Sequence, residues 1–194
     1  MKLFDWVAAI VLSLQLPIPL FWLIMHPLVG FWRRHMRAGY LVATLTAWGG
    51  VALALAVFHR RLFASAGAPV WARLIGLALI LADLCVIYRV ERELGSARLV
   101  GHTELKGGGE LAISGIYARV RHPRYAGMMF AALGACLLAG TLLLWVVAAV
   151  WWLLALTAVG LEERELRARF GAAYEAYCKR VPRFLPFRFW PSEE

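Results

Sequence analysis

The feature that most restricts the fold is a stretch of 36 residues, 126–161, that contains no charged side chain. About 20 helical residues cross the hydrocarbon core of a bilayer, so this stretch is too long for one ordinary span and long enough for two short ones. Gly140 and Thr141 supply a break near its middle. The sequence therefore predicts a helical hairpin that returns both of its ends to one side of a membrane.

Three more apolar stretches precede the hairpin, at residues 6–31, 39–58 and 70–88. The chain is 62% hydrophobic, whereas soluble domains average about 45–50% apolar residues. We therefore expect an all-α integral membrane protein with five transmembrane helices. Residues 1–194 form one membrane domain in this interpretation, with three N-terminal spans in residues 1–88. Pro17 and Pro19 are expected to kink the first span, which we interpret as retained rather than as a removed signal peptide.

The basic residues predict the orientation of these spans. With the N-terminus outside, 17 of the 21 Lys and Arg residues fall on the inner side and three on the outer side. Cytoplasmic loops of membrane proteins carry such an excess, so we expect a cytoplasmic C-terminus. The net charge of +9 is spread between apolar stretches. This pattern suits contact with the lipid bilayer rather than a nucleic-acid partner.

The C-terminal tail, beginning at residue 162, predicts a cytoplasmic amphipathic helix. Its apolar side chains recur every three or four residues and form one face. They are Leu166, Phe170, Tyr174 and Tyr177. The helix is expected to end near Val181, because Pro182 follows. At the other end of the hairpin, a helix is expected to begin at or just after Pro123, since proline suits a first helical turn.

Two charged clusters flank the hairpin and should face each other, because its ends return to the same side. The first cluster contains Arg119, Arg121, His122 and Arg124, and the second contains Glu162, Glu163 and Glu165. Together they could hold a zwitterionic ligand, or they could simply pair with each other. Taken separately, arginines at a span end usually anchor to headgroups and a glutamate pair is usually solvated.

The segments SGIYARVRHPRYAG and EERELRARFGAAYEAYCKRVPRFLP, in this order around a hairpin, resemble the isoprenylcysteine carboxyl methyltransferase family. The resemblance covers about residues 110–186. It implies a membrane enzyme that uses S-adenosylmethionine, with residues 89–194 as the cofactor-binding core and the active site facing the cytoplasm. The implied acceptor is lipophilic, and a carboxylate, a thiol and a lipid amine remain open. No metal is expected.

The resemblance also implies site residues. The expected cofactor contacts are His102, Gly109, Glu110, Leu111, Ala112, Tyr117, Arg121, His122, Pro123, Arg124, Tyr125 and Glu162. The chemistry agrees, because Glu162 suits the cofactor's ammonium and Arg121 or His122 its carboxylate. A tyrosine face can receive the sulfonium by cation–π attraction. Glu163 is the candidate catalytic residue, which would prepare the nucleophile of the acceptor.

One departure from the family leaves the acceptor open. Isoprenylcysteine methyltransferases have a substrate-contacting arginine four residues before the glutamate pair, and Ala158 stands there. Two other classes also remain. One is an NADPH-dependent membrane oxidoreductase of the sterol reductase type, although such enzymes have an Arg-Asp-Glu signature where this chain reads Leu161-Glu162-Glu163. The other is a non-enzymatic membrane protein whose charges only anchor its helices.

Overall fold

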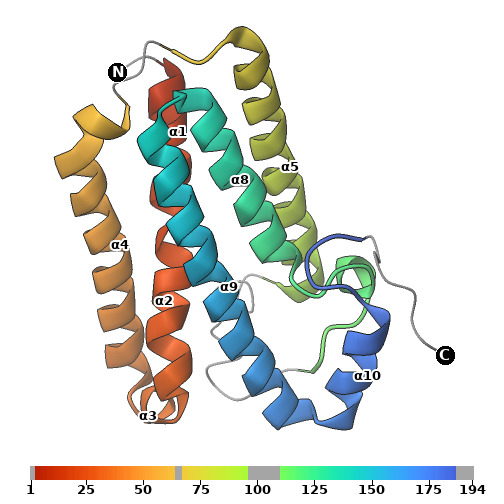
Figure 1. Cartoon of the computed structure of the whole chain (residues 1–194). Helices are drawn as coiled ribbons and strands as arrows, with labels where there is room; N and C mark the ends of the chain where they lie inside the picture. Colours follow the sequence, from red (N-terminus) through yellow and green to blue (C-terminus); the bar gives the residue numbers. More distant parts are fainter. Residues whose placement is uncertain (1–2, 64–66, 96–109, 187–194) are drawn as a thin grey trace.

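The computed structural model describes residues 3–63, 67–95 and 110–186, and all regular elements in these ranges are helices (Figure 1). In chain order they are α1 (Leu3–Gln15), α2 (Pro17–Met25), η1 (His26–Leu28), α3 (Val29–Arg34), α4 (Met36–Leu62), α5 (Val70–Leu94), η2 (Gly115–Ala118), α8 (Pro123–Ala139), α9 (Leu142–Phe170) and α10 (Ala172–Arg180). The predicted all-α class is confirmed for the described residues.

Among the described residues, four helical segments are long and apolar enough to cross a membrane. They are Leu3–Met25, Ala38–Leu62, Val70–Leu94 and Leu142–Phe170, and α8 is a shorter apolar helix of 17 residues. Their outer faces carry large apolar side chains that are more than 60% exposed, including Leu45, Leu53, Leu81 and Leu153. Such faces suit lipid, since helices satisfy their backbone polar groups internally. The count of five spans stays a prediction.

The predicted hairpin is formed by α8 and α9, and it breaks at Gly140 and Thr141 as expected. Gly140 adopts a left-handed conformation with φ of 69°, and its N–H donates to the Cys136 carbonyl at 2.8 Å. Glycine is favoured there because it has no Cβ to strain this conformation. The Thr141 hydroxyl donates to the Leu62 carbonyl at 2.6 Å, which ties the turn to the end of α4.

The first predicted span is made of two helices in line, α1 and α2 (Figure 1). Pro17 begins α2, where its missing N–H costs little. The Leu16 carbonyl just before it accepts a hydrogen bond from Trp151 Nε1 of α9 at 3.3 Å. The prolines thus interrupt the span at a point where the neighbouring helix supplies a donor.

Helix α8 packs against α1, α5 and α9, and 12 of its 17 residues are buried. Small residues allow the closest of these approaches. A Cβ added at Gly134 would lie 2.6 Å from the Gly76 carbonyl oxygen of α5 and 2.8 Å from Ile80 Cγ1. The backbones of α5 and α8 therefore contact each other directly at this level.

We expect Gly134→Ala to lower the free energy of unfolding by about 1–3 kcal/mol, because the added methyl group meets backbone that cannot rotate away. Unfolding in mixed micelles with increasing dodecyl sulfate measures the change. Gly160→Ala is the matched control, since a Cβ at Gly160 of α9 meets nothing within 4 Å. Equal stability of the two variants would contradict the close packing of α5 on α8.

The C-terminal tail was predicted to form one helix, but it is divided between the end of α9 and α10. Helix α9 continues without a break to Phe170, and the chain then turns at Gly171, where φ is 50°. From there α10 folds back toward η2 (Figure 1). The expected apolar face is nevertheless present, because Leu166, Phe170, Tyr174 and Tyr177 pack in one cluster with Leu111. The expected end is also confirmed, since α10 stops at Arg180 and Val181 caps it.

Candidate functional site

The site is built where three segments meet: residues 110–122, the end of α9, and α10 with the residues after it. Two backbone hydrogen bonds join the first segment to the last. The Arg121 N–H donates to the Pro182 carbonyl and the His122 N–H to the Arg183 carbonyl, both at 2.9 Å. The segment before α8 is thereby fixed to the segment after α10.

At the centre of this junction Glu163 forms a buried ion cluster. Its side chain is 1% exposed. Arg121 Nη2 and Arg183 Nε both donate to Oε1 at 3.1 Å, and Arg183 Nη2 donates to Oε2 at 2.5 Å. His122 Nε2 lies 3.1 Å from Oε1. The two charged clusters that flank the hairpin therefore do meet, and Glu163 is their common partner.

The remaining donors of Arg121 hold the end of α10. Its Nη1 donates to the Val181 carbonyl at 2.7 Å and to the Cys178 carbonyl at 3.0 Å. Carbonyls at a helix end lack helical partners, and a cation there also suits the helix dipole. The hydrogen bonds from Arg183 to Glu163 raise the pKa of that guanidinium. Both arginines therefore connect Glu163 to the segments around it.

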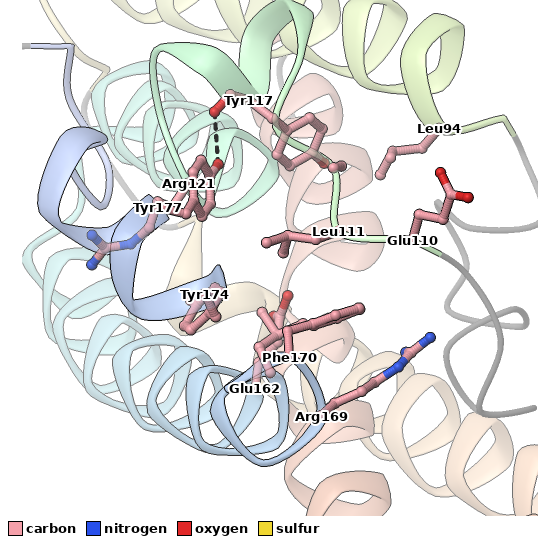
Figure 2. A pocket seen from close by; sticks show the side chains of 12 residues that line it. Leu94, Glu110, Leu111, Tyr117, Arg121, Glu162, Arg169, Phe170, Tyr174 and Tyr177 are labelled. Carbon is pink, nitrogen blue, oxygen red and sulfur yellow. Dashed lines mark hydrogen bonds between the residues drawn. The ribbon is translucent and has the colours of Figure 1, made fainter. Parts of the chain in front are cut away.

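Beside this cluster lies an open pocket of about 530 Å³, its mouth included (Figure 2). The pocket is lined by Leu94, Glu110, Leu111, Ala112, Tyr117, Arg121, Glu162, Leu166, Arg169, Phe170, Tyr174 and Tyr177. Its wall combines aromatic faces with charges of both signs, as a zwitterionic ligand with an aromatic ring would require.

The two adjacent glutamates face different surroundings. The Glu162 side chain is 34% exposed and lines the pocket, whereas Glu163 lies in the ion cluster. Successive helical residues point about 100° apart, which follows from 3.6 residues per turn. Glu162 is therefore accessible to a ligand, while Glu163 is occupied by protein donors.

Behind Glu162 stand two buried side chains, His122 and Tyr125. His122 Nδ1 lies 3.9 Å from Glu162 Oε1, so the imidazole lies between the two glutamates. The Tyr125 ring meets the His122 ring edge-on, with centroids 6.1 Å apart. The buried Tyr125 hydroxyl has no hydrogen-bond partner among the described residues. The Glu162 carboxylate is nevertheless close enough to interact with it electrostatically.

The tyrosines of α10 close the pocket on another side. The Tyr177 hydroxyl donates to the Tyr117 carbonyl at 2.6 Å, which fixes η2 to α10 (Figure 2). Burial raises the pKa of Tyr177 to about 12, and it also raises the pKa of Tyr174. Both side chains are therefore neutral at physiological pH, and Tyr177 remains a donor.

Six of the predicted cofactor residues line the pocket: Glu110, Leu111, Ala112, Tyr117, Arg121 and Glu162. His122, Pro123 and Tyr125 are buried behind it. His102 and Gly109 lie outside the described residues. Sequence reasoning missed Leu94, Arg169 and the aromatic pocket wall, although it recognised the apolar face to which Phe170 and Tyr174 belong.

Arg124 does not line the pocket. Its Nη1 donates to Asp83 Oδ1 and its Nη2 to Gln15 Oε1, both at 2.9 Å, and Gln15 Nε2 donates to Asp83 Oδ2 at 2.7 Å. Asp83 and Gln15 are 2% and 5% exposed. This triad joins α1, α5 and α8 inside the bundle. The signal for it was available, because a lone acidic residue within an apolar span usually marks a buried partner.

Comparison with known proteins gives a family match that includes much of this site. The profile described as phospholipid methyltransferase matches residues 71–173, more than half of the chain. The protein named Protein-S-isoprenylcysteine O-methyltransferase from Schizosaccharomyces pombe is 41% identical over 80 residues. That segment is 39% of this chain and 33% of the relative, so the match spans a third of the relative's length. No solved structure matches significantly.

Proposed function

The chain belongs to the phospholipid methyltransferase family, and from this we propose that it transfers a methyl group from S-adenosylmethionine to a lipophilic acceptor at the cytoplasmic surface of a membrane. The observation that carries the proposal is the pocket itself. It presents the Glu162 carboxylate, the Arg121 and Arg169 guanidiniums and four aromatic rings to one space. The cofactor is an amino acid zwitterion joined to a sulfonium and a purine, and each part has a counterpart in this lining.

We assign the parts of the cofactor by charge and shape. Glu162 would accept hydrogen bonds from its ammonium, and an arginine of the lining would donate to its carboxylate. Phe170, Tyr174 and Tyr117 offer rings for the purine and for the sulfonium. When bound, the cofactor supplies an activated methyl group and leaves as a neutral thioether. The residues of the chain bind and orient the reactants, which accounts for large rate gains without a strong base.

Glu163 is better suited to positioning than to proton abstraction. Both of its oxygens accept hydrogen bonds from arginines, and His122 contacts one of them. A carboxylate with so many cationic partners is a weak base. We therefore propose that Glu163 holds Arg121 and His122 in place beside the pocket.

The acceptor would come from the bilayer. At 1.5 Å per residue, α8 is about 26 Å long, less than the roughly 30 Å of a hydrocarbon core. If the helix crosses the membrane, its first residues lie no farther out than the headgroups, so the neighbouring pocket is close to the bilayer surface. Ala158 is fully buried in the hydrophobic core and brings no positive charge to the site. Ala158 therefore supplies no contact for an acceptor carboxylate, and a carboxylate, a thiol and a lipid amine all stay open as acceptors.

The test is calorimetric titration of S-adenosylhomocysteine into the detergent-purified protein. We expect saturable binding, weakened about 10- to 150-fold in Glu162→Gln, since a hydrogen bond to a charged group contributes about 1.5–3 kcal/mol. Glu175→Gln is the control, because Glu175 is exposed on α10 and pairs with Arg167 outside the pocket.

Unchanged affinity in Glu162→Gln would refute the assignment of the ammonium site. Saturable binding of NADPH, with no binding of S-adenosylhomocysteine, would replace the proposed activity by the oxidoreductase alternative. Thermal unfolding of each variant shows that the protein titrated is folded.

A further inference from the structure

A second concave site lies beside the pocket and shares none of its lining residues. It is formed by the last two turns of α5 together with η2 and the residue after it. Its lining residues are Tyr88, Arg89, Arg92, Glu93, Gly115, Ile116 and Arg119. We call it the arginine groove. In the proposed assignment, the cofactor is held by the other pocket, so this space is not needed for it.

Within the described residues, no ion pair balances the arginines of the arginine groove. Arg89, Arg92 and Arg119 are exposed, and none has an ion-pair partner among the described residues. The one carboxylate of the lining, on Glu93, accepts a hydrogen bond from the Ile116 N–H at 3.3 Å. The groove therefore presents three guanidiniums and one engaged carboxylate, and it suits a ligand that carries negative charge.

Glycine makes the closed contact between Glu93 and η2 possible. Gly115 has φ of 54°, and a Cβ at this residue would overlap the Glu93 carboxyl group. The carboxylate can therefore lie against the backbone of η2 and leave the arginines facing outward.

The groove is placed at the level of lipid headgroups. Helix α5 is apolar through Ile87 apart from Arg73 and Asp83, and its charged end begins at Arg89. Between them stands Tyr88, which is 63% exposed. Aromatic residues gather at the boundary between hydrocarbon and headgroups, so the arginines just beyond it lie where lipid phosphates lie. Basic sites beside membrane helices commonly bind anionic headgroups.

We propose that the arginine groove binds the phosphate of an anionic phospholipid from the surrounding leaflet. Guanidiniums donate paired hydrogen bonds that match phosphate oxygens. Tyr88 would lie against the glycerol and the upper part of the acyl chains. A soluble phosphate ester has the same anionic group without the acyl chains. The experiment must therefore distinguish a phospholipid from a soluble phosphate.

The probe is a fluorescent short-chain phosphatidylglycerol, added to the full-length protein in neutral detergent. We expect saturable binding that Arg92→Gln/Arg119→Gln weakens about 25-fold, since each basic residue near a membrane surface contributes about five-fold. Lys179→Gln/Arg180→Gln is the matched control. It removes the same charge from exposed residues of α10, on the same end of the bundle, and should leave the affinity within about two-fold of wild type.

Equal weakening by the two double variants would show that only overall charge attracts the lipid, and the proposal would fail. It would also fail if inorganic phosphate displaced the probe as well as unlabelled phosphatidylglycerol does, or if phosphatidylcholine of the same chain length bound equally. Titration of S-adenosylhomocysteine into Arg92→Gln/Arg119→Gln runs in parallel. Cofactor affinity is expected to be unchanged there, so loss of lipid binding is read independently of the methyltransferase assignment.

Discussion

Glu163→Ala is expected to lower the free energy of unfolding by about 3–5 kcal/mol, the usual result of removing one partner from a buried ion pair. The substitution leaves Arg121, Arg183 and His122 converging on a space without an anion. Arg121 can then no longer be held against both α9 and the end of α10. Unfolding in mixed micelles with increasing dodecyl sulfate measures the loss.

The control for this prediction is Glu175→Ala, which removes an exposed ion pair with Arg167 and should change the stability by no more than about 1 kcal/mol. Glu163→Gln keeps one acceptor oxygen and should lie between the two. A Glu163→Ala protein as stable as the control variant would show that the cluster does not hold the site together. If Glu163→Gln retained its fold and its cofactor affinity but lost only turnover, the catalytic assignment of Glu163 would be favoured over positioning.

The second large effect is expected at Asp83. Asp83→Ala leaves the Arg124 guanidinium with Gln15 as its remaining hydrogen-bond partner among the described residues, and without a carboxylate. We expect a loss of about 3–5 kcal/mol in the free energy of unfolding. The measurement is again unfolding in mixed micelles.

A double variant tests whether the uncompensated charge of Arg124 causes this loss of stability. In Asp83→Leu/Arg124→Leu both charges are gone, and exchanging a buried ion pair for apolar side chains is often neutral or stabilising. The double variant should therefore be more stable than Asp83→Ala. A double variant that is less stable than the single one would mean that the hydrogen bonds to Gln15, rather than an uncompensated charge, determine the effect. Cofactor affinity of Arg124→Leu also tests whether Arg124 contacts the cofactor, as the resemblance implies.

The parts of the fold that depend on length and hydropathy were predictable. A charge-free stretch of 36 residues with Gly140 near its middle has few alternatives to a hairpin, and the structure has the break at that residue. The meeting of the two charged clusters follows from the hairpin alone. The pairing within them does not, because Glu162 and Glu163 are neighbours in sequence and differ only in the helix face they occupy.

Features that depend on one residue's backbone or on distant partners were not predictable. Gly171 could have continued the helix at a small cost, but it has a positive φ, and after the turn Tyr174 and Tyr177 pack in one cluster with Leu111. Arg124 belongs to the same short motif as His122, yet it points to a carboxylate 41 residues away. Asp83 is the only acidic residue in the apolar stretch 70–88, but periodicity does not identify its partner.

Helix α8 packs against α1, α5 and α9, and most of its residues are buried by these neighbours. A helix in that position does not need large hydrophobic side chains. It needs small side chains, so that the neighbouring helices can approach it closely, and its alanines and glycines provide them. Its variation among related chains should therefore be limited by side-chain volume, whereas the outer helices should tolerate any bulky side chain that dissolves in lipid.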